Sequence, residues 1–313
     1  MTKVFIDGSQ GTTGLKIFNR FENRNDIELL TINQEKRKDP TERARMINMS
    51  DITFLCLPDD ASREAVSMVT NENVKIIDTS TAHRTNPEWA YGFPELSDQL
   101  LHKVQTCNRI AVPGCYASGF NSIVYPLISH GIISADYPIT CYAMSGYTGA
   151  GKKGIAQYED TQRDPELDAP RQYALSQEHK HLKEMKAISG LAVTPFFAPH
   201  ICDYPRGMVV SIPLFTDMLT KKYTKQELQQ VFACHYRGKA FVKVRPIGYT
   251  TGMISGNTFA GRDDMEIEIN GNDDRIVITS RFDNLGKGAS GAAIECMNIA
   301  LGLDPTTGLN IGE

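Results

Sequence analysis

One cysteine of this sequence lies in a setting that favours chemistry. Cys115 belongs to Val-Pro-Gly-Cys-Tyr-Ala-Ser-Gly (112–119), in which Pro113 and Gly114 break the preceding apolar run 109–112. Small residues compatible with a helix follow the thiol, and the unpaired backbone N–H groups of a helix N-terminus stabilise a thiolate. We therefore interpret Cys115 as a nucleophile, which together with a dinucleotide site would indicate covalent aldehyde chemistry. The alternative is an inert buried cysteine, the usual state of a free thiol.

The other six cysteines have no such setting. The total of seven is odd, the spacings are wide and no Cys-x-x-Cys pair occurs, so we expect neither a disulfide framework nor a metal site. Most should be small buried residues, as for Cys56 in an apolar strand and Cys296 in a C-terminal helix.

Thiol chemistry also needs a group that moves protons, and histidine titrates near neutral pH. His179 and His181 lie in a polar segment, 176–185, in which we expect a helix to begin at Ser176 or Gln177. Residues 181, 184 and 185 would then share one helix face. A solvated helix residue is the alternative for either histidine.

Segment 198–207 offers a rival histidine and an arginine. His200 lies in what we interpret as a loop before the strand 208–214, where its simplest role is to hold the loop geometry. Arg206 would bind a substrate carboxylate or phosphate through two hydrogen bonds. A structural arginine at the start of a strand explains the same residue equally well.

Residues 145–153, Ser-Gly-Tyr-Thr-Gly-Ala-Gly-Lys-Lys, follow an expected strand and combine hydroxyls, glycines and positive charge. A loop of this kind would cradle a phosphate group of a ligand. The alternative is a mobile loop with Lys152 and Lys153 in solvent.

A glycine-rich turn near the N-terminus indicates a dinucleotide site. The apolar run 3–7 leads into Gly8, Gly11 and Gly14, and apolar residues follow at 15, 17, 18 and 21. This spacing predicts a strand, a phosphate-binding loop and a helix whose N-terminus faces a pyrophosphate. The expected coenzyme contacts are Gly8, Ser9, Gln10, Gly11, Thr12, Thr13 and Gly14. A tight turn without a ligand is the alternative.

The next strand favours NADP over NAD. The run 27–33 ends at Asn33 without the carboxylate that would bind a ribose 2′-hydroxyl, and Lys36, Arg37 and Lys38 follow. Cations and an amide suit a 2′-phosphate, although charge runs are often only solvated. Ser80, in a polar strand exit, and Gly286, in a late run of small residues, complete the expected coenzyme site.

The pattern of elements predicts an α/β fold with two parts. Strands at 3–7, 27–32, 52–57, 74–78 and 109–112 alternate with helical segments, one of them beginning at Asp59 or Asp60, which is typical of a doubly wound parallel sheet of the Rossmann type. From about residue 139 the strands form hairpins, which predicts an α+β catalytic domain with a mostly antiparallel sheet. A late helix at 292–301 would return to the first domain. The predicted domains are 1–116 with 286–313, and 117–285.

Composition excludes several functional classes. The 313 residues are 41% hydrophobic with a net charge of −4, which allows a large core and gives no reason to expect nucleic acid or a membrane surface as partner. No run of about 18 apolar residues and no signal peptide core is visible, so we expect a cytoplasmic protein.

The sequence resembles the N-acetyl-γ-glutamyl-phosphate reductase family in its shorter form. The resemblance runs through most of the chain, with Ser118 where threonine is usual; its motifs are the turn at Gly8, Gly11 and Gly14, Tyr91-Gly-Phe-Pro-Glu-Leu, Pro113-Gly-Cys-Tyr-Ala, Ser145-Gly-Tyr-Thr-Gly-Ala-Gly, His179-Lys-His-Leu-Lys-Glu, Pro205-Arg-Gly and Gly286-Lys-Gly-Ala-Ser-Gly.

The resemblance implies a reaction of arginine biosynthesis. The Cys115 thiolate would attack N-acetyl-L-glutamyl 5-phosphate, phosphate would leave, and the thioester would accept hydride from NADPH to give N-acetyl-L-glutamate 5-semialdehyde. The acid/base would be His179 or His181, with His179 favoured. Substrate contacts would come from Ser145, Gly146, Glu184 and Arg206. A homo-oligomer, dimer or tetramer, is also implied.

Two other classes remain open from the residues. One is a related thiol dehydrogenase, such as an aspartate-semialdehyde or phosphorylating aldehyde dehydrogenase, because motifs do not define acyl chain length. The other is a non-catalytic dinucleotide-binding redox sensor that acts through Cys115. Activity measured with a panel of acyl phosphates distinguishes a reductase of this family from the related thiol dehydrogenases. Alkylation of the thiol, with NADPH oxidation as the readout, distinguishes an enzyme from a redox sensor, because a sensor has no turnover to lose.

Overall fold

The computed structural model of the chain describes residues 1–22 and 24–312. It divides into a first unit, residues 1–114 with 289–309, and a second unit, residues 115–288 with 310–312. The sequence placed these boundaries at 116 and 286. Residues 23 and 313, both assigned to the predicted first domain, lie outside the described residues.

The first unit holds a parallel sheet in the order β2-β1-β3-β4-β6-β5, and every neighbouring pair is parallel. The expected strands are confirmed to within a few residues, whereas β5 was not expected. The strands are β1 (Thr2–Asp7), β2 (Ile27–Leu30), β3 (Ile52–Leu55), β4 (Lys75–Asp78), β5 (Ala90–Tyr91) and β6 (Arg109–Ala111).

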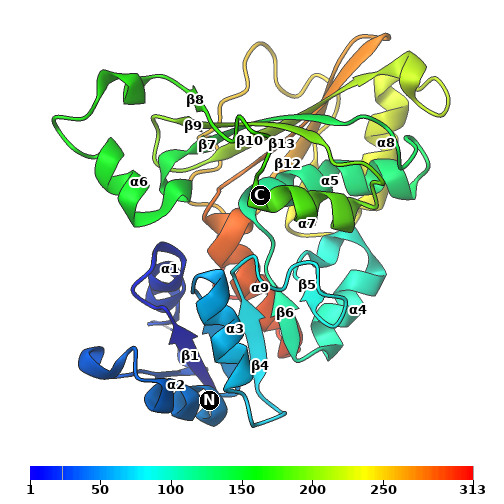
Figure 1. Cartoon of the computed structure of the whole chain (residues 1–313). Helices are drawn as coiled ribbons and strands as arrows, with labels where there is room; N and C mark the ends of the chain where they lie inside the picture. The colour runs from blue at the N-terminus through cyan, green and yellow to red at the C-terminus, as the bar shows by residue number, and fades with distance from the viewer. Residues whose placement is uncertain (23, 313) are drawn as a thin grey trace. The chain divides into compact units, whose positions relative to one another are not determined.

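Helices cover both faces of this sheet because successive strand residues point to opposite cores. Val4 and Ile6 join one apolar cluster, and Phe5 joins another. The first cluster packs against α1 (Thr12–Phe21), α4 (Asp98–Thr106) and α9 (Gly291–Ala300), and the second against α2 (Pro40–Met49) and α3 (Asp59–Ser67). The doubly wound arrangement is therefore confirmed (Figure 1).

The second unit contains a seven-stranded sheet in the order β11-β12-β13-β10-β7-β9-β8. Four of its pairs are antiparallel, whereas β11–β12 and β7–β9 are parallel. The strands are β7 (Thr140–Gly146), β8 (Arg171–Gln172), β9 (Phe196–Cys202), β10 (Met208–Phe215), β11 (Val242–Val244), β12 (Met265–Gly271) and β13 (Arg275–Phe282). The mostly antiparallel sheet is confirmed, with parallel pairs that the hairpin pattern did not indicate.

Strand β9 corrects one expectation. His200 lies within this strand, and not in a loop. Pro199 made the segment look irregular, because proline cannot donate to a ladder and usually excludes an interior strand. Here the Pro199 carbonyl still accepts the backbone N–H of Tyr173, so the strand continues through the proline.

Helices α5 (Cys115–Ser129) and α7 (Lys180–Ser189) lie on one side of the second sheet (Figure 1). The α5 helix approaches the sheet closely, because a Cβ at Gly119 would lie only 2.4 Å from the side chain of Val210. Helix α8 (Lys225–His235) packs against β11 and β12, and α6 (Gly151–Tyr158) follows β7. No helix of the described residues is long and apolar enough to cross a membrane.

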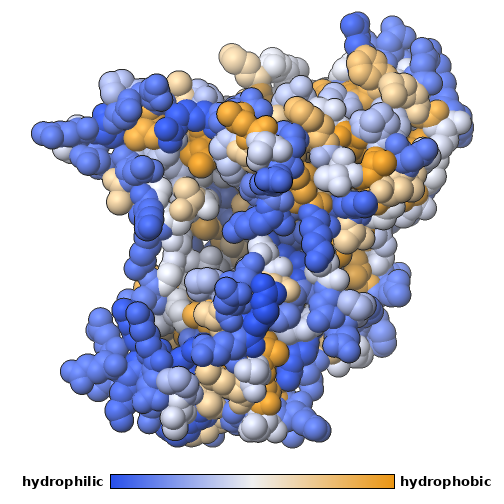
Figure 2. Space-filling view, in the orientation of Figure 1, coloured by the Kyte–Doolittle hydropathy of each residue, from blue (hydrophilic) through white to orange (hydrophobic). Residues whose placement is uncertain are grey.

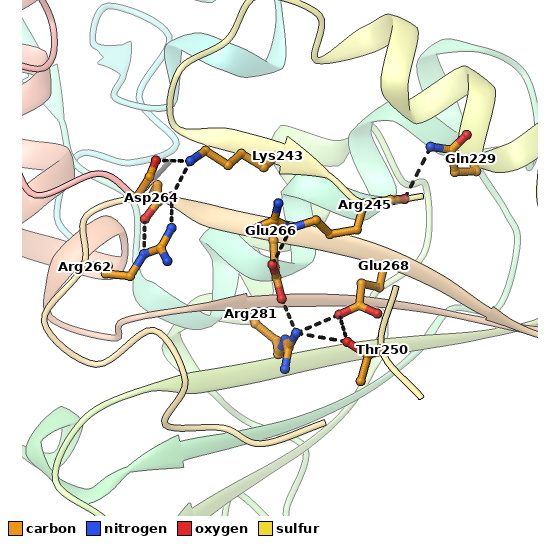
Figure 3. Close-up of polar contacts among 10 residues, drawn as sticks. Gln229, Lys243, Arg245, Thr250, Arg262, Asp264, Glu266, Glu268 and Arg281 are labelled. Atoms are coloured by element: carbon orange, nitrogen blue, oxygen red, sulfur yellow. Dashed lines mark hydrogen bonds and ion pairs between the residues drawn. The ribbon is translucent and has the colours of Figure 1, made fainter. Parts of the chain in front are cut away.

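A buried network of charges ties β12 to β13 (Figure 3). Glu266 and Glu268, which alternate with apolar residues on β12, both contact Nη2 of Arg281. Arg245 lies 2.7 Å from the second oxygen of Glu266, and the Thr250 hydroxyl donates to Glu268 at 2.8 Å. The network therefore fixes the register of β12 on β13 and anchors the segment that connects β11 to β12.

Candidate active site

The glycine-rich turn of the first unit has the geometry expected of a phosphate-binding loop. Gly8 has φ of +89°, and a Cβ there would lie 2.3 Å from the carbonyl oxygen of Cys56. A Cβ at Gly14 would lie 2.4 Å from the Gly8 oxygen, whereas Gly11 has more room. Helix α1 begins directly after Gly11 with no side-chain cap and no acidic residue in its first turn. The helix N-terminus is therefore suited to a pyrophosphate.

A cavity of about 620 Å³ opens beside this turn. It is bounded by the loop residues 8–10, by apolar side chains of α1 and β2, and by Arg37 and Lys38. The two cations lie in an exposed segment, and the surface over the loop before α2 is hydrophilic in Figure 2. A cavity with an apolar wall and cations at its edge suits an adenosine carrying a 2′-phosphate.

Asn33 and Lys36 are among the expected coenzyme residues that do not line this cavity. The side chain of Asn33 caps the short turn 34–36 by accepting the N–H of Glu35 at 3.3 Å. Lys36 points to Glu42, with 4.0 Å between Nζ and the carboxylate. Lys38, which was not assigned a contact, lies in the cavity wall instead.

The wall of the cavity also contains a charged triad that sequence reasoning missed. Arg43 of α2 is buried, with Nε 3.0 Å from Asp7 and Nη1 2.8 Å from Glu64. Burial raises the pKa of Asp7, and the Arg43 charge opposes that rise. An isolated Asp at a strand end and an Arg in a helix give no signal that they will meet, because their pairing is non-local.

Ser80 lies at the carboxyl end of β4, as expected, but it is engaged within the protein. Its hydroxyl donates to the buried carboxylate of Asp78 at 2.7 Å, and its N–H donates to the other oxygen at 2.9 Å. His83 Nδ1 also lies 2.7 Å from Asp78, and its ring stacks on Trp89. These contacts make the strand exit rigid.

In the second unit, Cys115 is the first residue of α5 and is half-buried. The expected position of the thiol at a helix N-terminus is confirmed. A Cβ on Gly288 would lie 2.9 Å from the Cys115 Cβ, so Gly288, in the single-turn π-helix 286–290, lies directly against it. Burial raises the pKa of Tyr173, and the negative charge of a Cys115 thiolate adds to this rise, which places the tyrosine within electrostatic range of the sulfur.

Both predicted histidines belong to an aromatic group beside Cys115. The ring of Tyr116, the residue after the nucleophile, lies 5.9 Å from His179 and 6.0 Å from His181. The two imidazoles are 4.8 Å apart and nearly perpendicular, and Phe197 packs on His179 at 5.2 Å. The structure therefore brings together the cysteine segment and the histidine segment, which are distant in sequence.

The start of α7 was predicted wrongly. The helix begins at Lys180, and His179 is its N-cap, with Nδ1 accepting the backbone N–H of His181 at 3.1 Å. Burial, with a smaller effect of Lys180, lowers the pKa of His179 to about 4. His179 is therefore neutral at neutral pH, and one of its nitrogens is occupied by the cap.

The shared face of residues 181, 184 and 185 is confirmed, since all three are buried. Of the remaining predicted substrate residues, Ser145 is buried and its hydroxyl donates to the Gly146 carbonyl at 3.1 Å. A Cβ on Gly146 would lie within 2.8 Å of the backbone of the turn 204–206. Gly146 therefore allows the turn that carries Arg206 to pack closely.

Arg206 forms an ion pair with the fully buried Asp283, with 2.7 Å between Nη2 and Oδ2. Gly286, expected to contact the coenzyme, lies in the second unit, where a Cβ would meet the carbonyl oxygen of Arg262 at 1.9 Å. The need for glycine at this position thus has a packing explanation.

Comparisons with known proteins agree with this division of the chain. Residues 3–104 match the semialdehyde dehydrogenase NAD binding domain, and residues 115–284 match the semialdehyde dehydrogenase dimerisation domain. A Nostoc protein named N-acetyl-gamma-glutamyl-phosphate reductase 2 is 44% identical, covering 98% of this chain and 99% of its own. The reductase of Sinorhizobium fredii is 43% identical over 96% and 98% of the two chains.

Solved structures show the same fold at low sequence identity. Aspartate semialdehyde dehydrogenase II of Vibrio cholerae, complexed with ASA, has a TM-score of 0.72 at 14% identity and covers 96% of this chain and 98% of its own. A probable aspartate-semialdehyde dehydrogenase of Pseudomonas aeruginosa gives the same TM-score at 13% identity, over the same shares of the two chains. The resemblance seen in the motifs is thus confirmed: the chain belongs to the semialdehyde dehydrogenase family, among the N-acetyl-gamma-glutamyl-phosphate reductases.

Proposed function

We propose that this protein reduces N-acetyl-L-glutamyl 5-phosphate to N-acetyl-L-glutamate 5-semialdehyde and phosphate, a step of arginine biosynthesis. The observation that carries the proposal is a cysteine at the first position of a helix, followed by Tyr116, whose ring packs near both histidines of one short motif. The chain is also at least 40% identical to relatives named N-acetyl-gamma-glutamyl-phosphate reductase.

The coenzyme is NADP. Gly8, Gly11 and Gly14 leave the N-terminus of α1 open to the pyrophosphate, and Arg37 and Lys38 offer charge to the 2′-phosphate. Asn33 and Lys36 are retained only as residues that shape this loop, because the cavity wall does not include them. When bound, NADPH supplies the hydride that the reduction requires.

The chemistry starts with the Cys115 thiolate, which the N-terminus of α5 stabilises. The sulfur attacks the acyl carbon, the carbon–oxygen bond to phosphate breaks, and a thioester to Cys115 remains. After reduction the carbon–sulfur bond breaks, which releases the aldehyde and restores the thiolate. Each turnover consumes one proton, which leaves with the phosphate.

His181 is the residue that we assign to proton transfer, in place of the favoured His179. It would accept the proton of the thiol and return it to the departing phosphate oxygen. The His179 pKa of about 4 and its use as a helix cap make it a poor proton donor at neutral pH. We assign His179 to the support of the first turn of α7, on which His181 and Glu184 lie.

We also propose a homodimer through the face of the second sheet opposite α5. Tyr142 and Met144 on β7 are half exposed, while Cys141 and Ala143 between and beside them are buried, so one face of the strand is apolar and uncovered. Exposed apolar sheet faces commonly mark subunit interfaces. The family match of this unit is a dimerisation domain. Sedimentation equilibrium that shows only a 34.7 kDa species would refute the dimer.

A cytoplasmic location follows as a further proposal. All seven cysteines lie in the described part of the chain, and each is a free thiol. Free thiols persist in reducing compartments. Fractionation of the native cell, with the protein followed by antibody, tests this.

The direct test of function is NADPH oxidation that depends on the acyl phosphate. We expect N-acetyl-L-glutamyl phosphate to support turnover with kcat/KM at least about 100-fold above that for L-aspartyl phosphate, because buried polar groups that bind the substrate discriminate strongly. Faster turnover of aspartyl phosphate would favour the aspartate-semialdehyde alternative. No NADPH oxidation with any acyl phosphate, together with NADP binding, would favour the redox sensor.

A further inference from the structure

Arg206 has more hydrogen-bond donors than the described residues engage. It lies in the turn between β9 and β10, and its guanidinium meets one carboxylate, that of Asp283. The side chain is one-quarter exposed, and its Nε is buried without an acceptor among the described residues. An arginine carries five N–H donors in a fixed fork, so several remain for an oxyanion.

Asp283 is the residue that holds this arginine. It follows β13, and its carboxylate is fully buried. Oδ2 lies 2.7 Å from Nη2 of Arg206 and accepts the backbone N–H of Gly261. Oδ1 accepts the N–H groups of Leu285 and Gly286, the former at 2.8 Å. A buried carboxylate is tolerated only with such a full set of donors, so this site is built around the charge.

The backbone carbonyl of Asp283 shapes the segment that lies beside the nucleophile. The Asp283 carbonyl accepts the N–H groups of Gly286 and Gly288 at 3.1 and 3.0 Å. These bonds shape the turn 286–290, and Gly288 of that turn lies against Cys115. One residue therefore connects the arginine to the turn beside the reactive sulfur.

We propose that Asp283 is a positioning residue that directs Arg206 toward an oxyanion of the acyl phosphate substrate while its other oxygen supports the turn beside Cys115. This inference rests on the proposed function. Fixing the fork before binding lowers the entropy cost of recognising the anion. The substrate has two anionic groups, a carboxylate and the phosphate, and both offer the oxygen geometry that an arginine fork binds.

Asp283→Asn is designed to disrupt the contacts of Oδ2 and to keep those of Oδ1. The amide oxygen still accepts from Leu285 and Gly286, whereas the amide NH₂ faces two donors, Arg206 and the Gly261 N–H. We expect the KM for the acyl phosphate to rise by about 10-fold to 100-fold, the loss typical of one charged hydrogen bond, with a smaller change in kcat. The alkylation rate of Cys115 by iodoacetamide should stay within about 2-fold, because the turn is retained.

A double-mutant cycle with Arg206→Met decides whether Asp283 acts through Arg206. We expect Asp283→Asn to raise KM in the wild-type background and to change it by less than about 2-fold in the Arg206→Met background. Equal effects in both backgrounds would overturn the proposal and leave Asp283 a purely structural residue. Inhibition by inorganic phosphate and by N-acetyl-L-glutamate, measured for Arg206→Met, identifies the oxyanion as the phosphate or the carboxylate.

Two further variants keep the cycle interpretable. Asp283→Glu retains the charge but moves it, so a raised KM with a preserved melting temperature supports the proposal even if the Asn variant does not fold. Glu266→Gln is the matched control, a buried carboxylate paired with a different arginine. Its KM should equal that of the wild type, and a KM rise as large as that of Asp283→Asn would contradict the proposal. A wild type without acyl-phosphate-dependent activity would instead refute the proposed function.

Discussion

Arg206 and Arg281 both meet buried carboxylates in the second unit, yet their surroundings differ. Nη2 of Arg281 contacts Glu266 and Glu268 and lies 3.4 Å from the hydroxyl of Thr250, and the side chain is 8% exposed (Figure 3). Arg206 faces one carboxylate and is 25% exposed. Both leave Nε without an acceptor among the described residues, so exposure and the number of partners distinguish them.

This difference separates a cation that completes the fold from one that is available to a ligand. Arg281 is buried beside two glutamates; it shares Glu266 with Arg245 and, among the described residues, is the one cation paired with Glu268. The Asp283 carboxylate holds the Arg206 guanidinium, and part of the Arg206 side chain stays exposed to solvent. The first unit repeats the contrast, because Arg43 is held between Asp7 and Glu64 while Arg37 is exposed at the edge of the cavity.

The largest effect is expected from removing the nucleophile, which belongs with Arg206 to the site that is available to a ligand. Cys115→Ala should lower kcat/KM for NADPH oxidation by about 10⁴-fold or more, since no other group of the site replaces a covalent nucleophile. The melting temperature should change little, because the thiol is only half-buried. Residual activity above about one tenth of the wild type would remove Cys115 from the mechanism.

The two histidines differ in the same way, because we assign His181 to proton transfer and His179 to the support of α7. His181→Asn should lower kcat by about 10²-fold to 10⁴-fold, the usual contribution of a general acid/base. His179→Asn should cost less than about 10-fold, because asparagine is also a good N-cap for α7. Steady-state kinetics with both variants decides between them, and the reverse ranking would return the proton transfer to His179.

The two arginines themselves should fail in different ways. Arg281→Met should destabilise the protein by about 3–5 kcal/mol, because Glu268 then keeps only a hydroxyl donor. Arg206→Met should destabilise it less, since backbone N–H groups still surround Asp283, but should raise the substrate KM. Urea unfolding and kinetics on both variants test this. A raised KM without destabilisation for Arg281→Met would contradict the assignment of a structural role to Arg281 and a substrate-binding role to Arg206.

In the first unit, the exposed cations should matter for the coenzyme and not for the fold. Replacing Arg37 and Lys38 together by alanine should raise the KM for NADPH by about 10-fold to 100-fold, as expected for lost charged hydrogen bonds. The KM for NADH should change much less, because NADH lacks the 2′-phosphate. Equal changes for both coenzymes would show that these residues do not bind that group.

The smallest effect expected concerns the capping histidine and pH. The pKa of His179 is lowered to about 4 from an ordinary value of 6.5, so the unfolded chain binds the proton more readily. Stability is therefore full above pH 6.5 and falls as the pH drops toward 4, by about 1 kcal/mol after screening by solvent is allowed for. Urea unfolding of His179→Asn should lack this component, and identical pH dependence in both proteins would contradict it.

Much of the fold could be predicted because its signals are local. The first βα unit, the alternation of strands and helices, and Cys115 at a helix N-terminus all follow from neighbouring residues. Two local signals misled. Pro199 hid strand β9, and Ser176 and Gln177 were preferred as helix starts over His179, whose imidazole performs the cap.

The contacts that define the candidate site could not be predicted because they are non-local. Nothing near Asp283 in the sequence indicates that Arg206 will pair with it, and the same holds for Asp7 and Arg43. Burial of His181 and partial exposure of Arg206 depend on packing across the whole unit. The motifs therefore predicted which residues take part, and the tertiary structure was needed to propose different roles for them.

The central claim is that the acyl group is transferred to Cys115. Mixing the enzyme with N-acetyl-L-glutamyl phosphate in the absence of NADPH, followed by acid quench, tryptic digestion and mass spectrometry, tests it directly. We predict one phosphate released per active site and one N-acetylglutamyl group on the peptide that contains Cys115. Phosphate release only after NADPH is added, with an unmodified Cys115 peptide, would contradict the account.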